Sequence, residues 1–94
     1  MAFLIRLIPP RPTFAQDMSE HEREVMGRHA AHWRGLLDRG TAVAFGPVLD
    51  PAGSWGLGLL DLAVQDEAVK VAASDPAVLS GVCTYELLPM QLVR

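Results

Sequence analysis

The chain has 94 residues, which is enough for one compact domain over residues 1–94 and too few for two. The formal net charge is −3 and the eight basic residues are spread singly, so no basic stripe is available for phosphates, which argues against a nucleic-acid partner. Half of the residues are hydrophobic and only 20% are charged, which predicts more buried surface than a small monomer can hide.

Residues 2–8, AFLIRLI, are predicted to form a strand that stops at the prolines of the next segment, because proline cannot donate to a ladder. Arg6 interrupts the apolar start of the chain, which is too short to span a membrane and lacks the cleavage pattern of a signal peptide. We therefore expect no membrane contact and no export. A loop is predicted after the prolines.

A long helix is predicted from about residue 20 to Asp38 or Arg39. Ser19 is placed to act as N-cap with Glu22 at the third helical position, which is the capping-box pattern, and Gly40 closes the helix.

The second half of the chain contains three further elements. Residues 41–50 and 55–63 are rich in β-formers and flank the turn cluster PAGS, so together they predict a β-hairpin. Residues 65–74 carry alanine, valine and charged residues at helical intervals and predict a short helix. Residues 81–93 supply the last strand, which is kinked or ended at Pro89.

The order β-α-β-β-α-β predicts an α+β protein of the ferredoxin-like class, with a four-stranded antiparallel sheet and two helices on one face. The segments AFLIRLI, TAVAF and GLGLLDL are apolar at both odd and even positions, whereas a sheet with one face in water alternates. The second face therefore needs a cover. A second copy of the chain is the simplest cover, and we predict a homodimer through the open sheet face.

His29 is the first candidate for chemistry, because helical spacing puts it on the apolar face of the long helix with Val25 and Trp33. A histidine there is either a core residue with satisfied polar atoms or an acid–base group with a carboxylate partner. Asp75 is the candidate partner, since the predicted topology puts the end of the second helix on the same sheet face. Asp75 before Pro76 also predicts an N-cap for a one-turn segment over PAVLS, which leaves one carboxylate oxygen free.

Four further residues are candidates for contact with a small molecule. Gly46 and Pro47 lie inside a predicted strand, where glycine marks a bulge or a close approach of the backbone to another group, such as a pocket wall. Ser54 follows the hairpin turn and either satisfies the turn backbone or offers its hydroxyl to a ligand. Trp33 is predicted to lie in the core or to line the pocket.

Metal and cofactor signals are weak. His32 follows His29 by three residues, so the two imidazoles and Asp75 could together form a metal site. The sequence contains no established ligand spacing such as H-E-x-x-H, so this signal is weak. Cys83 is the only cysteine, which rules out an internal disulfide and suits a reducing cytoplasm. No Walker loop, G-x-G-x-x-G after a strand, or nucleophile elbow occurs. We expect no metal, no cofactor and a cytoplasmic location.

Two stretches, MGRHAAHWRGLLDRGTAVAFGPVLDPAGSWGLGLL and ASDPAVLSGVCTYELLPM, carry a family resemblance. They resemble the YciI-like (YCII-related) proteins, small members of the dimeric α+β barrel superfamily, over nearly the whole chain from Phe3 to Met90. The segments RPTF and MSEHEREVM depart from this pattern and are typical of a longer subgroup. Their extended first loop either covers the pocket or only reaches it.

The resemblance implies a ferredoxin-like subunit, a face-to-face dimer and an active site on a His-Asp pair, which falls on His29 and Asp75. It also puts Ser54 and the Gly46-Pro47 segment near the same cavity. One better understood relative removes chloride from a hydroxylated aromatic ring.

Two main functional hypotheses follow for this chain. In the first, His29 exchanges a proton with a small aromatic or lactone-like substrate while Asp75 orients it, as in a lyase, dehalogenase or isomerase. Ser54 or backbone amides near Gly46 then hold a developing oxyanion. In the alternative, a non-catalytic metabolite-binding or accessory homodimer uses His29 only as a buried hydrogen-bonding group. A purely structural dimer would leave the inward histidine without a purpose.

Overall fold

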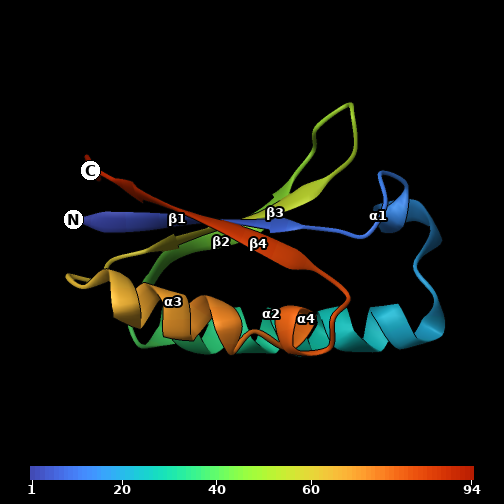
Figure 1. The fold of residues 1–94 in the computed structure, drawn as a ribbon, viewed down its shortest axis with the longest axis horizontal. Coiled ribbons are helices and arrows are strands. Elements are labelled where there is room, and N and C mark those ends of the chain that lie inside the picture. The colour runs from blue at the N-terminus through green and yellow to red at the C-terminus, as the bar shows by residue number, and fades with distance from the viewer.

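Four strands and four helices follow one another in the computed structural model, which describes residues 1–94. The strands are β1 (Ala2–Ile8), β2 (Ala42–Val48), β3 (Trp55–Leu60) and β4 (Thr84–Met90). The helices are α1 (Phe14–Asp17), α2 (Glu20–Asp38), α3 (Gln65–Ala73) and α4 (Pro76–Leu79). The strands form one antiparallel sheet in the order β2-β3-β1-β4, and α2, α3 and α4 cover one face (Figure 1). The α+β, ferredoxin-like prediction is confirmed.

Helix α2 begins and ends where the local signals predict. The Ser19 side chain accepts a hydrogen bond from the Glu22 backbone N–H at 3.1 Å, and the Glu22 carboxylate accepts one from the Ser19 N–H at 2.8 Å. Gly40 follows the helix with a φ of 77°, in the left-handed region that glycine adopts without strain. The buried face of α2 includes Val25 and Trp33.

The boundaries of the last strand differ from the predicted range 81–93. The Cys83 N–H donates to the Ala77 carbonyl at 2.8 Å, so this part of the backbone closes the turn after α4 and β4 begins later. At its other end, β4 continues through Pro89. Proline is tolerated there because β4 is an edge strand, and Pro47 lies in β2, the opposite edge strand.

Gly46 and Gly58 differ in what lies beside their Cα atoms. The register of β2 shifts between Ala42 and Ala44, and a Cβ at Gly46 would meet nothing within 4 Å. A Cβ at Gly58 in β3 would overlap the ring of Trp33. The expected bulge at Gly46 is therefore absent, whereas the alternative, a backbone position in a pocket wall, fits the cavity that Gly46 lines.

The core between the sheet and the helices consists of two clusters of buried residues. The larger contains Phe3, Ile5, Trp33, Leu36, Ala42, Leu60, Ala68 and Ala72. The smaller contains Leu7, Val25, Ala77 and Cys83. Helix α2 contributes Val25 to one cluster and Trp33 to the other. His29 lies between these two residues in the sequence of α2.

The opposite face of the sheet carries no helix, and the β2–β3 hairpin rises from it (Figure 1). One cross-strand row on this face consists of Ala44, Leu59, Leu4 and Leu88. Leu88 is 57% exposed. The next row contains an ion pair between Arg6 and Glu86 at 3.6 Å. An apolar row thus crosses all four strands on the uncovered side.

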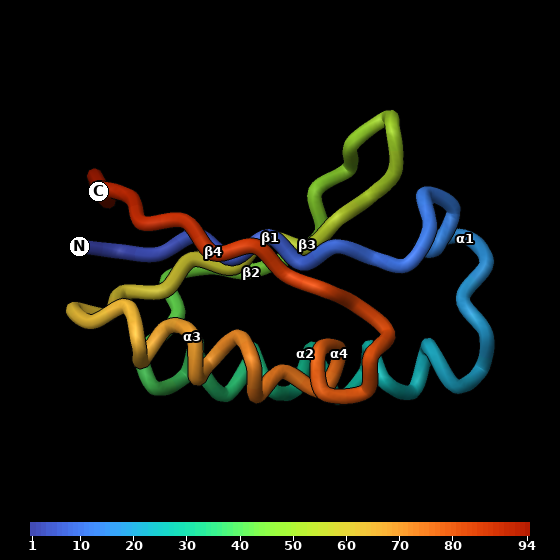
Figure 2. Tube along the Cα trace, viewed as in Figure 1, coloured from blue at the N-terminus to red at the C-terminus, as the bar shows by residue number.

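The loop that was predicted after the first strand contains one helical turn, α1. Figure 2 shows the chain leaving β1, turning through α1 beside the sheet and descending to the start of α2 in the helix layer. Phe14 in α1 is only 5% exposed. A four-residue turn is too short to produce helical periodicity, which explains why the sequence pattern did not predict it.

Candidate functional site

A cavity of about 260 Å³ lies between the sheet and the first two helices. Its walls come from α1, α2, the end of β1 and the β2–β3 hairpin. Four aromatic residues line it: Phe14, Trp33, Phe45 and Trp55. No lysine, arginine, aspartate or glutamate is among the lining residues. The cavity is therefore an apolar space whose main titratable side chain is an imidazole, that of His29.

His29 and Asp75 lie within hydrogen-bonding distance, with 2.7 Å between Nδ1 and Oδ2. The His29 side chain is 16% exposed and lines the cavity, whereas the Asp75 side chain is 2% exposed. The carboxylate is therefore behind the imidazole, sealed from solvent. Because Nδ1 is engaged by Asp75, Nε2 is the nitrogen of His29 that remains for a ligand.

Local structure places the Asp75 carboxylate. Asp75 is the N-cap of α4, with Pro76 in the first turn, and its Oδ1 accepts a hydrogen bond from the Ala77 N–H at 2.9 Å. The predicted capping role is thus confirmed. The cap uses Oδ1 and leaves Oδ2 for side chains of α2, because each carboxylate oxygen can accept hydrogen bonds.

Trp33 has a second role that the sequence analysis missed. Its indole N–H donates to Oδ2 of Asp75 at 2.8 Å, the same oxygen that contacts His29. The indole also stacks on Phe45, with ring centroids 6.1 Å apart, and lines the cavity. The spacing of four residues between His29 and Trp33 puts both on one helix face, so this spacing was the available signal.

Opposing effects set the pKa of the Asp75 carboxyl. Burial raises it, because the charged form loses hydration. The hydrogen bond and charge of His29, then the N–H groups of Ala77 and Trp33, lower it and outweigh burial. The pKa of Asp75 therefore lies below its ordinary value, and at neutral pH the side chain is a carboxylate that can only accept hydrogen bonds. It follows that Nδ1 of His29 carries the hydrogen.

The candidate substrate-binding residues gather around the same cavity. Trp33, Gly46, Pro47 and Ser54 all line it, together with His29. Their roles toward a ligand stay predictions. Gly46 contributes backbone rather than side chain, and the space beside its Cα is open.

The family model for the YCII-related domain matches residues 1–91. The chain belongs to the YCII-related family. The resemblance seen in the sequence is thereby confirmed over nearly the whole chain. No curated protein sequence matches this YCII-related chain.

A solved structure with the same fold is the 5-chloro-2-hydroxyhydroquinone dehydrochlorinase from Burkholderia phenoliruptrix AC1100 in complex with 2,5-dihydroxybenzoquinone. Its TM-score to this YCII-related protein is 0.72 at 18% sequence identity. The match covers 97% of this chain and 94% of that chain. At this identity the likeness shows the fold.

Cys83 also lines the cavity of this YCII-related protein, which the sequence analysis did not anticipate. Burial raises the pKa of its thiol to about 11, and the negative charge of Asp75 acts in the same direction. A thiol with this pKa is protonated at neutral pH and is a poor nucleophile. Cys83 is therefore a small apolar wall residue of the cavity.

His32 is not among the residues that line the cavity. Its Nε2 is buried without a hydrogen-bond partner. No group of three or more His, Cys, Asp or Glu side chains is arranged to hold a metal ion. The metal site considered for His29, His32 and Asp75 is therefore not formed. None of the helices is long and apolar enough to cross a membrane.

Proposed function

We propose that this YCII-related protein is an enzyme that moves a proton on a small, flat, hydroxylated ring. His29 is the proton-transfer group and Asp75 is the positioning residue behind it. The observation that carries the proposal is the 2.7 Å contact between His29 Nδ1 and Asp75 Oδ2 at the wall of an apolar cavity. A carboxylate in this position holds the imidazole in one tautomer and one orientation.

The lining of the cavity favours an uncharged ring over an anionic metabolite. Because no lysine or arginine lines it, a carboxylate or phosphate would lose hydration without gaining a counter-charge. An apolar cavity of roughly 150 Å³ holds benzene, and drug-sized ligands occupy about 300–1,000 Å³. A volume of about 260 Å³ therefore suits one ring with a few substituents. The quinone in the similar structure is a single substituted ring of this size.

The proposed reaction begins with a ring hydroxyl hydrogen-bonded to Nε2 of His29. Nε2 takes the hydroxyl proton and returns it to a ring carbon, which by itself is an isomerisation to the keto form. If that carbon carries a leaving group, removal of a second hydroxyl proton expels the group with the electron pair of its bond. The products are a quinone and one molecule of acid. The Ser54 hydroxyl or a backbone N–H near Gly46 stabilises the transient oxyanion.

Chloride release from 5-chloro-2-hydroxyhydroquinone, followed together with quinone absorbance, tests this proposal. We expect turnover by the wild type and a loss of about 100-fold or more in His29→Ala, because general acid–base groups contribute about 10²–10⁴-fold. His32→Ala is the matched control, since His32 lies on the same helix outside the cavity. Unchanged turnover in His29→Ala would remove His29 from the mechanism.

A non-catalytic ligand-binding protein is the second candidate. The observation that favours it is the scarcity of polar side chains on the cavity wall, where only His29, Ser54, Cys83 and two indoles offer polar atoms. In this case 2,5-dihydroxybenzoquinone binds and no hydroxylated ring is turned over. Calorimetric titration of that quinone, run beside the turnover assay, separates the two functions.

We also propose that the open sheet face pairs with a second copy of the chain. The row formed by Ala44, Leu59, Leu4 and Leu88 is apolar across the whole sheet, which water disfavours over such a width. Sedimentation at micromolar concentration is expected to give the mass of two chains for the wild type and of one for Leu59→Asp. A wild type that sediments as one chain contradicts the pairing.

A further inference from the structure

We propose that residues 9–18 form a clamped cap on the cavity, and that Phe14 and Met18 in this cap limit the size of the ring that the cavity accepts. The cap is the chain segment between the end of β1 and the N-cap of α2. This inference deepens the proposed function by assigning ring size to named residues. It rests on that function only for the chemical identity of the ligand.

The cap supplies one wall of the cavity. Pro9, Phe14, Ala15 and Met18 all line it, opposite residues contributed by α2 and the β2–β3 hairpin. Figure 1 shows α1 at the end of the sheet, above the first turns of α2. Phe14 is almost fully buried, so its ring fills space that a ligand would otherwise occupy.

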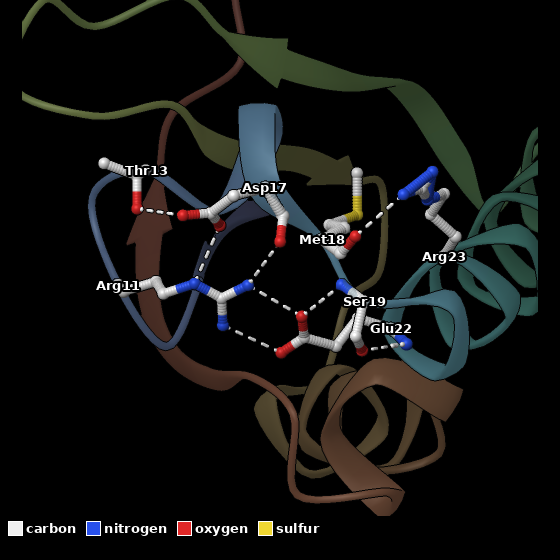
Figure 3. Close-up of polar contacts among 7 residues, drawn as sticks. All are labelled: Arg11, Thr13, Asp17, Met18, Ser19, Glu22 and Arg23. Carbon is white, nitrogen blue, oxygen red and sulfur yellow. Dashed lines mark hydrogen bonds and ion pairs between the residues drawn. The ribbon is translucent and has the colours of Figure 1, made fainter.

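Arg11 fastens the cap to α2, as Figure 3 shows. Its guanidinium donates to both carboxylate oxygens of Glu22, at 2.7 and 2.9 Å, which is the bidentate geometry of a strong Arg–carboxylate pair. It also donates to the Asp17 carboxylate at 2.8 Å and the Asp17 carbonyl at 3.0 Å. The same guanidinium lies 5.4 Å from the centre of the Phe14 ring.

Two further contacts hold the cap from other directions. Gly53, in the turn of the β2–β3 hairpin, has a φ of 134° and lies so near the cap that a Cβ there would be 2.9 Å from the Pro12 Cα and carbonyl oxygen. Arg23 of α2 donates to the Met18 carbonyl at 3.0 Å. The cap is therefore fastened both to the helix layer and to the hairpin.

These contacts decide how the cavity responds to a larger ligand. A free loop would move aside at little cost, whereas this segment can move only if the Arg11–Glu22 pair opens or Phe14 leaves its buried place. A ligand that extends beyond the cavity on this side must therefore displace Phe14 or Met18. The largest ring that the cavity accepts is therefore set by the side chains of the cap.

Binding of benzene and naphthalene, measured by NMR titration, tests the cap without involving acid–base chemistry. We expect the affinity ratio of naphthalene to benzene to rise about tenfold in Phe14→Ala, because the substitution removes side-chain volume from the cavity wall. The milder Phe14→Leu is expected to raise the ratio less. Arg11→Met is expected to raise the ratio about fivefold. Arg28→Met, which removes an exposed charge from α2 rather than from the cap, is the matched control and leaves the ratio unchanged.

Hydrogen exchange of the amides of residues 14–18 gives an independent measure of the clamp. Arg11→Met is expected to increase their exchange, while Arg28→Met does not and the α2 amides stay protected in both variants. A ratio and an exchange rate that do not change in Arg11→Met or Phe14→Leu overturn the cap. Because hydrocarbon binding involves no proton transfer, the ratio in the Phe14 and Arg11 variants is read independently of turnover, so failure of the proposed catalysis is distinguishable from failure of the cap.

Discussion

Asp75 and Arg11 each collect several hydrogen bonds beside the same cavity, but their surroundings are opposite. Asp75 accepts from His29, Trp33 and the Ala77 backbone, and its side chain is 2% exposed. Arg11 donates to Asp17 and Glu22 with a side chain that is 35% exposed. The buried cluster holds the group that would move a proton, and the exposed cluster holds the cap.

This difference in burial sets what each cluster can do. An unpaired polar group in the interior loses hydration with nothing in return, so the Asp75 cluster acts as a unit that cannot lose a member cheaply. Water replaces lost contacts at the exposed cluster and salt screens its charges. The cavity therefore has a rigid wall on the side of Asp75 and, on the side of Arg11, a wall held by contacts that water and salt weaken.

Removing the buried hub is expected to have the largest effect. Asp75→Ala leaves the N–H groups of Trp33, Ala77 and His29 without an acceptor, and loss of one partner from a buried pair costs about 3–5 kcal/mol. Urea denaturation measures this loss in the free energy of unfolding. Asp61→Ala is the control, because Asp61 pairs with Arg94 in a half-exposed contact. Equal losses of unfolding free energy in the two variants would contradict the difference expected between buried and exposed contacts.

Alkaline pH is expected to destabilise the buried side of the cavity. The thiol of Cys83 has a pKa of about 11 in the folded chain against an ordinary value of 9.0. Since the folded pKa is raised, the protonated thiol contributes stability fully below pH 9, and this is lost as pH rises toward 11. Linkage gives a loss of about 2–3 kcal/mol. Unfolding curves between pH 8 and 11 measure it, and Cys83→Ala removes this part of the pH dependence.

Adding a side chain at Gly58 is expected to destabilise the fold by displacing the Trp33 ring. An added methyl in Gly58→Ala overlaps the indole ring and moves its N–H away from Asp75, with an overpacking cost of about 1–3 kcal/mol. Gly27→Ala is the control, because a Cβ there meets nothing within 4 Å and alanine favours the helix. Thermal unfolding distinguishes them: Gly58→Ala lowers the melting temperature and Gly27→Ala does not. A stable Gly58→Ala would mean that the indole shifts freely.

The smallest effect on global stability is expected at the exposed cluster. Arg11→Met should lower the melting temperature slightly at low salt, and the difference from wild type should vanish near about 1 M salt. The hydrogen bond from Arg11 lowers the pKa of Glu22 to about 2. Since the folded pKa is lowered, the pair contributes above the ordinary pKa of 4.5 and is lost as pH falls toward 2. A salt-independent loss would show that the contact with Phe14 dominates.

Local signals made much of this structure predictable from the sequence. The capping box at Ser19 and Glu22 and the Asp75-Pro76 step each involve residues within one helical turn, so the pattern shows them directly. The approach of His29 to Asp75 followed from the order of the elements, because the topology puts α2 and α4 on one sheet face.

What the sequence did not show depends on contacts between distant residues. Arg11 and Glu22 pair across a loop with no periodicity, and several other carboxylates of the N-terminal half were equally plausible partners. Several glycines lie in the hairpin strands, and only the position of the Trp33 ring distinguishes Gly58 from Gly46. Side-chain packing, rather than backbone propensity, decides both features.

Pro47 and Pro89 bear on how copies of this protein can associate. Each lies in one of the two outer strands of the sheet, so each border lacks one backbone N–H for a further strand. Fibre-like growth by strand addition is thereby discouraged at both borders. The apolar leucine row on the flat of the sheet meets no such obstacle, so the proposed pairing of two chains through this face would give a closed, finite assembly.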